Sequence, residues 1–177
     1  VLDLLHAERL RPDDVAEIRV GVRPSTLTMI GEPREIRVRP RTMLDAQMSL
    51  PYSLAVAMLD GEAGIAQFAP ERLSDPAVLA LADRIHAYAH PDLESAKAGN
   101  LTSYLDLSTR DGRRFRERLT SYRGHPDNPM SDAEMEAKFR RCAGLRLSEA
   151  RVEAAVEAIW GLDKLASLEP LLAAVAG

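Results

Sequence analysis

Three polar side chains, Gln47, Ser49 and Tyr52, lie at the start of an apolar segment, and their spacing fits a site for a small anion. Ser49 is typical of a helix N-cap and Pro51 of a first helical turn, so the sequence predicts that a helix begins here. The first turn of a helix presents backbone N–H groups and the positive end of the helix dipole, and both favour a negative charge. We therefore predict Tyr52 as a catalytic residue, acting as an acid or as a carboxylate contact, and Ser49 and Gln47 as substrate-binding residues.

Tyr52 and Ser49 also have purely structural interpretations. Tyr52 is typical of a core aromatic residue whose hydroxyl bonds a nearby carbonyl. Ser49 is typical of a helix cap that touches no ligand, because serine before a hydrophobic run is the ordinary signal of a helix start. Both alternatives stay open at the level of the sequence.

Four arginines precede this helix start and are candidate ligands for carboxylates. Arginine presents a planar fork of donors that matches the geometry of a carboxylate. Arg41 is nearest to the helix start, and we predict that it binds substrate; the alternative for each of the four is a solvated surface position. The four residues are Arg34, Arg37, Arg39 and Arg41.

The helix that would carry Tyr52 is predicted to be buried. Between Leu50 and Leu59 the only strongly polar residue is Ser53, and Gly61 supplies a stop. A helix with no polar face must be surrounded by other elements. Ten residues are too few to span a bilayer, which needs about 20. The sequence therefore predicts a core helix with a polar entrance.

Composition restricts the class of protein. The chain has 177 residues, 46% of them hydrophobic, which predicts one compact domain over residues 1–177. A net charge of −4 gives no electrostatic reason to bind nucleic acid or an anionic membrane. Cys142 is the only cysteine, and no His or Cys cluster has metal-ligand spacing, so we predict no metal site and a cytoplasmic location. The opening V-L-D-L-L-H-A-E-R-L resembles the back half of a helix, so we expect a longer protein.

The strand signals predict a small antiparallel sheet of three or four strands. Residues 15–23 alternate between apolar and polar types, and Asp111-Gly112 is a strong hairpin signal between residues 101–108 and 113–122. Residues 85–88 could add a short strand. Residues 24–40 have no clear period and are predicted to be a loop with a short strand at 36–38.

Further helices follow from capping signals, and together with the sheet they predict an α+β fold with a helical C-terminal tail. Asp75-Pro76 predicts a helix start, and Ser131 with Glu134 forms a capping box. We expect the helices at Leu50, Pro76 and Asp132 to cover mainly one face of the sheet. The side chains predicted to face inward in the C-terminal helices are Met135, Phe139, Cys142, Val152, Val156, Ile159 and Trp160.

Four segments in the same order resemble the MmgE/PrpD family, which includes 2-methylcitrate dehydratase. They are D-A-Q-M-S-L-P-Y-S-L-A-V-A-M-L-D-G, the D-P-x-V-x-x-L-A-x-x-I pattern at residues 75–85, the D-G-R hairpin, and G-x-P-x-N-P-M-S-x-x-E-x-x-x-K-F. The resemblance is to the C-terminal, smaller domain alone. It implies that the family's all-helical N-terminal domain lies outside this chain. One departure is His125, which stands where the family typically has aspartate; we read it as structural drift.

The resemblance implies cofactor-independent lyase chemistry on small polycarboxylates. The reactions of the family are dehydration of 2-methylcitrate, decarboxylation of cis-aconitate and epimerisation of iminodisuccinate. It further implies that the base and most substrate-binding cations come from the other domain, that Tyr52 reaches the site from this one, and that the protein is a homodimer. A hydro-lyase is the first expectation; a family decarboxylase or epimerase, or an inactive binding or scaffold domain, is the alternative.

Overall fold

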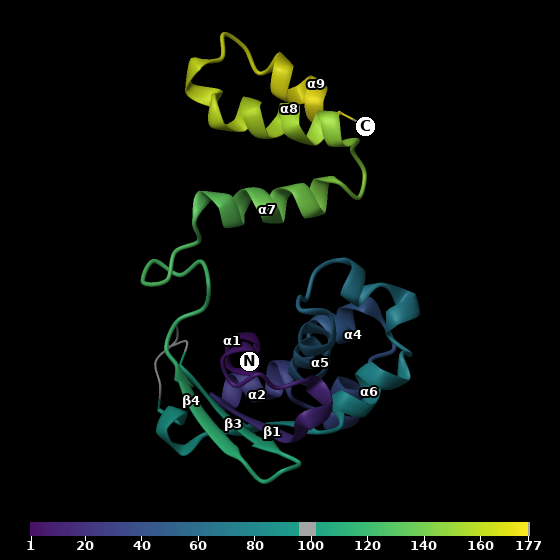
Figure 1. Cartoon of the computed structure of the whole chain (residues 1–177), viewed down its shortest axis with the longest axis vertical. Helices are drawn as coiled ribbons and strands as arrows, with labels where there is room; N and C mark the ends of the chain where they lie inside the picture. The colour runs from purple at the N-terminus through teal and green to yellow at the C-terminus, as the bar shows by residue number, and fades with distance from the viewer. Residues whose placement is uncertain (96–101, 177) are drawn as a thin grey trace. The chain divides into compact units, whose positions relative to one another are not determined.

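The computed structural model describes residues 1–95 and 102–176 and divides the chain into two compact units, Val1–Tyr122 and Arg123–Gly177. The first unit holds a sheet with helices, and in the second, over the residues described, the named elements are helices (Figure 1). The prediction of a single domain over residues 1–177 stays a prediction. The α+β class and the helical C-terminal segment are confirmed.

The sheet contains β1 (Val15–Val22), β2 (Ile85–Ala89), β3 (Ser103–Thr109) and β4 (Arg114–Leu119), in the order β2-β1-β3-β4. β3 is antiparallel to both β1 and β4, and the predicted hairpin turn has Gly112 at a φ of 90°. β2, however, is parallel to β1, so the prediction of a purely antiparallel sheet is wrong in this respect. The reason is the long helical crossover between Val22 and Ile85, which returns the chain in the same direction.

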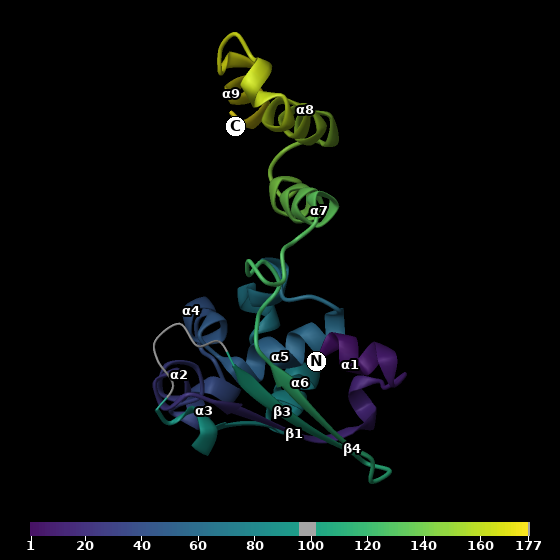
Figure 2. The same ribbon diagram turned by 90° about the vertical axis from the view of Figure 1, so that its left-hand side faces the viewer.

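One face of this sheet is apolar and packs against helices. Ile18 and Val20 of β1 pair with Leu107 and Leu105 of β3, and all four are buried. The core also includes side chains of α1 (Leu2–Ala7), α5 (Leu50–Asp60) and α6 (Pro76–Ala82). Figures 1 and 2 show α1 and α5 on the same side of the sheet.

The opposite face of the sheet is polar and carries a cluster of rings. Arg19, Asp106 and Arg116 are aligned across three strands on this face. The rings of His90 and Tyr104 stack with centroids 3.8 Å apart. They lie beside Gly21, where an added Cβ would be 2.8 Å from His90 and 2.9 Å from the Tyr88 hydroxyl. A larger residue at this position would therefore force the His90 and Tyr88 side chains to shift.

The segment predicted as a loop with a short strand is mostly helical, so that prediction is wrong. α2 spans Pro24–Ile30 and α3 spans Arg34–Val38. Pro24 occupies the first turn of α2, where its missing N–H costs nothing and its fixed φ suits the helix. The charged residues scattered through this segment leave it without a clear helical period, so the sequence pattern did not predict the two short helices.

α5 has the predicted boundaries and is a core helix. The Ser49 hydroxyl accepts the backbone N–H of Tyr52, and Gly61 ends the helix with a φ of 79°. Its buried residues include Tyr52, Ala55 and Val56, each 0% exposed. α4 (Met43–Gln47) precedes it, and Thr42 caps α4 through Asp45.

The second unit contains α7 (Asp132–Ala143), α8 (Glu149–Trp160) and α9 (Glu169–Val175). The capping box of Ser131 and Glu134 is confirmed. Met135, Cys142, Ile159 and Trp160 are exposed, however, so their predicted inward positions are wrong in the described residues. Periodicity identifies the apolar side of a helix but does not show whether a neighbouring element covers it. No helix in the described residues is long and apolar enough to cross a membrane.

Candidate functional site

Tyr52 lies in the first turn of α5 and is fully buried. Its hydroxyl donates a hydrogen bond to the backbone carbonyl of Gln67 at 3.0 Å, and its ring lies 6.0 Å from that of Phe68. Burial raises the pKa of Tyr52, and the nearby Arg72 partly offsets that effect. The tyrosine is therefore a neutral hydroxyl at physiological pH and acts as a hydrogen-bond donor.

The loop that covers Tyr52 is fastened by the side chain of Gln67. The Gln67 amide donates to Asp60 at 3.1 Å and accepts the backbone N–H of Gly64 at 3.0 Å. Asp60 ends α5, so the side chain ties the loop to the same helix that carries Tyr52. The Gln67 side chain thereby fixes the position of the backbone carbonyl that accepts the hydrogen bond from the Tyr52 hydroxyl.

Arg72 forms an ion-pair bridge next to this loop. Its guanidinium contacts Asp60 at 2.5 Å and also pairs with Asp75, the N-cap of α6. All three side chains are less than one-third exposed, at 29%, 23% and 25%. The bridge joins the end of α5 to the start of α6 and holds the loop between them.

Ser49 is buried and makes two hydrogen bonds. Its hydroxyl accepts from Tyr52 N at 3.0 Å and donates to the backbone carbonyl of Arg37 at 2.6 Å. Its oxygen and its proton are both engaged, and the side chain is 1% exposed. These contacts fit the capping alternative, and they place Ser49 beside Tyr52 as the sequence predicts.

Gln47 and Arg41 are both exposed, on α4 and just before it. In the described residues no hydrogen bond or ion pair joins either side chain to Tyr52. The other three candidate arginines are engaged elsewhere: Arg34 binds the carbonyls of Asp83 and Ile85, Arg37 binds those of Met29 and Glu32, and Arg39 pairs with Asp83. Arg41 is thus the one of the four whose guanidinium has no partner in the part of the chain that the structure describes.

The network of Asp60, Gln67, Arg72 and Asp75 was missed by the sequence analysis as a group. Asp75 was predicted to begin a helix, and it is the N-cap of α6; Asp60 is the last residue of α5. Nothing in their spacing indicated that Arg72 would join them. No group of three or more His, Cys, Asp and Glu side chains suited to a metal ion occurs in the described residues.

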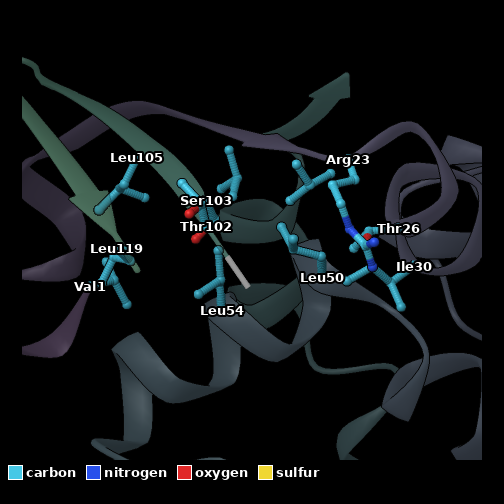
Figure 3. Close-up of a pocket in the computed structure, with 12 residues that line it drawn as sticks. Val1, Arg23, Thr26, Ile30, Leu50, Leu54, Thr102, Ser103, Leu105 and Leu119 are labelled. Carbon is cyan, nitrogen blue, oxygen red and sulfur yellow. The ribbon is translucent and has the colours of Figure 1, made fainter. Parts of the chain in front are cut away.

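A separate apolar pocket lies on the other side of α5. Its volume is about 350 Å³, and α5 contributes Leu50 and Leu54 to its wall (Figure 3). Arg23 and Thr26 lie at one end of it. None of the four predicted site residues lines this pocket. Its wall comes from elements far apart in sequence, so the sequence contained no local signal for it.

A family model described as the MmgE/PrpD C-terminal domain matches residues 1–162. This chain belongs to the MmgE/PrpD family. The match extends through the sheet, α5 with Tyr52, and the second unit as far as α8. The resemblance inferred from the four sequence segments is therefore confirmed.

Curated relatives of this MmgE/PrpD chain include three proteins named cis-aconitate decarboxylase. The one from Homo sapiens is 27% identical over 168 residues, which cover 91% of this chain and 32% of that protein. The one from Aspergillus terreus is 29% identical over 138 residues, covering 76% and 28% respectively. The one from Mus musculus is 25% identical over 126 residues, covering 71% and 26%. The chain thus spans about a third or less of the length of these relatives.

Proposed function

We propose that this chain is the C-terminal domain of a cofactor-independent lyase that acts on a small polycarboxylate. The observation that carries the proposal is the match to the MmgE/PrpD C-terminal domain across residues 1–162. Relatives named cis-aconitate decarboxylase provide further support. The catalytic base and most of the substrate-binding cations belong, in this proposal, to the part of the protein that precedes the chain. Cytoplasmic location and a homodimer are part of the same proposal.

Tyr52 is the residue that we assign to proton donation. In decarboxylation of cis-aconitate, the bond to CO₂ breaks, its electron pair stays on carbon, and that carbon takes up a proton. In dehydration of 2-methylcitrate, a base removes a C–H proton and the hydroxyl leaves as water after gaining a proton. Both reactions need an acid, and a tyrosine whose pKa is raised by burial keeps its proton at neutral pH.

Tyr52 has one hydroxyl proton, and in this structure it is engaged in the hydrogen bond to the Gln67 carbonyl. Donation to a substrate therefore requires that the hydroxyl leave the Gln67 carbonyl. The loop over Tyr52, which includes Ala66–Phe68, would have to shift for a substrate to reach the ring oxygen, because the side chain is fully buried. Arg41 and Gln47 are exposed and in this proposal bind substrate carboxylates only when the rest of the protein is present.

Decarboxylation of cis-aconitate is the reaction that we place first, because it is the one named in the curated relatives. Dehydration of 2-methylcitrate and epimerisation of iminodisuccinate are the alternatives within the family. A binding or scaffold role is a second candidate function. It is favoured by one observation, the bond that already satisfies the Tyr52 hydroxyl.

The test is an assay of the longer protein on cis-aconitate, 2-methylcitrate, citrate and iminodisuccinate. Release of CO₂, absorbance of the unsaturated product and chiral analysis distinguish the three reactions. Turnover of cis-aconitate with loss of CO₂ is expected. Turnover of one of the other three substrates instead would still support a lyase or epimerase, but it would assign a different reaction to the protein. A correctly folded longer protein with no turnover of any substrate would favour the scaffold function.

A further inference from the structure

The apolar pocket beside α5 is a feature of the first unit alone. All of the residues that line it lie between Val1 and Leu119, inside that unit. They come from β1, β3 and β4 of the sheet and from α2 and α5, with Val1 preceding α1. The volume of about 350 Å³ is within the range of about 300–1,000 Å³ that is typical of small-molecule sites. The pocket is therefore large enough to hold a ligand.

The lining of this pocket restricts the chemistry of that ligand. Eight of its twelve residues in the described part of the chain are valine, isoleucine or leucine, and three others carry hydroxyl groups. Arg23 is the one lining residue with a charged side chain. A polycarboxylate would place its second and third carboxylates against an apolar wall without a cation, which is unfavourable. The lining instead suits an apolar molecule with a single negative charge.

The charged and apolar groups lie at opposite ends of the pocket. Arg23 and Thr26 are at one end, and Leu105 and Leu119 are at the other (Figure 3). Leu54 of α5 lies between the two ends. Arg23 is half-buried at the N-cap of α2, so its guanidinium is held close to the apolar wall. A ligand would therefore have its charge at one end and an apolar chain along its length.

We propose that this pocket binds a straight-chain aliphatic monocarboxylate of about eight to ten carbons. Its carboxylate would accept hydrogen bonds from Arg23 and Thr26, and its chain would contact Leu54 and reach Leu119. An apolar cavity of about 150 Å³ in another protein holds benzene, with six carbons, so a pocket of about 350 Å³ accommodates a longer chain. This inference goes beyond the proposed lyase function, because neither Tyr52 nor any polycarboxylate takes part in it.

A series of carboxylates of increasing length tests the proposal. We would titrate the longer protein with butanoate, hexanoate, octanoate, decanoate and dodecanoate by isothermal titration calorimetry. Burial of one methylene strengthens binding about fourfold, so the Kd should fall roughly 10-fold or more at each step. The fall should stop at about decanoate, when the pocket is full. We expect a Kd on the order of 0.1 mM for octanoate. Citrate should not displace octanoate.

Two variants address the two ends of the pocket. Arg23→Gln should weaken octanoate binding about 10-fold or more and change the binding of octan-1-ol, which has no charge, by less than about 2-fold. Leu119→Trp should fill the apolar end and shift the tightest binding to a shorter acid. Leu119 is 42% exposed, so this substitution should not prevent folding. The matched control is Leu44→Trp, because Leu44 lies on α4, is 67% exposed and does not line the pocket.

No binding of octanoate or decanoate to the longer protein would overturn the proposal. Binding to the 177-residue chain alone would also overturn it, because the rest of the protein would then occupy the pocket. An unchanged octanoate affinity in Arg23→Gln would refute the carboxylate contact. Affinity that keeps rising through dodecanoate, or an unchanged series in Leu119→Trp, would indicate nonspecific partitioning and refute the pocket as the site. These readouts do not use turnover, so a protein that binds octanoate but turns over none of the four polycarboxylates would refute the proposed function alone.

Discussion

The hydroxyl of Tyr52 donates a hydrogen bond of 3.0 Å to the backbone carbonyl of Gln67, and the Gln67 side-chain amide in turn donates one to Asp60. The candidate acid is thus held by the loop that buries it. The bond satisfies a hydroxyl that would otherwise be buried without a partner. The same bond must be exchanged for one to substrate if Tyr52 takes part in the reaction.

Tyr52→Phe separates the structural role of the hydroxyl from the chemical one. The ring and its buried area are kept, so the free energy of unfolding should fall by about 1 kcal/mol, the net value of one hydrogen bond. Loss of an acid should lower turnover of the longer protein by about 10²–10⁴-fold. Thermal melts and steady-state kinetics measure the two effects. Turnover within a few-fold of the parent, with a normal melt, would assign the hydroxyl to structure alone.

Arg72→Gln should destabilise the first unit. The substitution removes both ion pairs and leaves Asp60 and Asp75, each about one-quarter exposed, without their cation. Unpaired, largely buried carboxylates should lower the free energy of unfolding by about 1–3 kcal/mol. The control is Arg116→Gln, whose pair with Asp106 is at the surface and should contribute under about 1 kcal/mol. Urea unfolding of both variants tests this, and similar losses would contradict it.

Ser49→Ala should be more destabilising than an ordinary cap substitution. It removes the acceptor for Tyr52 N and the donor to the Arg37 carbonyl, both inside the protein. We expect a loss of about 2 kcal/mol in the free energy of unfolding. Ser148 is a matched control, because it occupies the N-cap of α8 without a side-chain hydrogen bond. Ser148→Ala should change stability by no more than about 0.5 kcal/mol. Equal effects in denaturant melts would show that the buried contacts of Ser49 are weak.

Gly21→Ala should destabilise the sheet by overpacking. The new methyl would be 2.8 Å from the His90 ring and 2.9 Å from the Tyr88 hydroxyl. Clashes of this kind typically cost about 1–3 kcal/mol. Replacing the ring as well, in Gly21→Ala with His90→Ala, should recover part of that loss relative to His90→Ala alone. Additive losses in a double-mutant cycle would show that the His90 ring is not the source of the clash.

Glu134 should make α7 sensitive to acid. Hydrogen bonds from Arg123 and then from Ser131 lower the pKa of Glu134 from 4.5 to about 2. A lowered pKa in the folded state means that the stabilising effect is present above pH 4.5 and is lost as the pH falls toward about 2. Helicity of the second unit, followed by site-resolved NMR, should therefore decrease over this window. Glu134→Gln should remove that pH dependence, and an unchanged profile would assign it to other carboxylates. High salt should weaken the effect, because the pair is exposed.

Local signals in the sequence determined several elements correctly. Ser49, Pro51 and Gly61 define the boundaries of α5, and the capping box of Ser131 with Glu134 defines the start of α7. The hairpin at Asp111-Gly112 and the alternation in β1 were also predicted. These features depend on residues within a few positions of one another, because caps and turns are satisfied by neighbouring backbone groups. The four ordered segments likewise indicated the family that the comparison confirmed.

Partner choices over longer distances were decided by the tertiary structure. The Tyr52 hydroxyl bonds the carbonyl of Gln67 because one loop passes over the ring. Arg72 forms ion pairs with both Asp60 and Asp75 because the end of α5 and the start of α6 lie close together. The helical crossover after β1 makes β2 parallel to β1. The five residues of β2 alone do not indicate whether the strand pairs in a parallel or an antiparallel direction. The sequence showed the apolar spacing of Met135, Phe139 and Cys142 in α7, but it did not show that Met135 and Cys142 would be exposed. A side chain's chemistry is set by its own type, whereas its partner depends on which distant backbone or side chain the fold brings within reach.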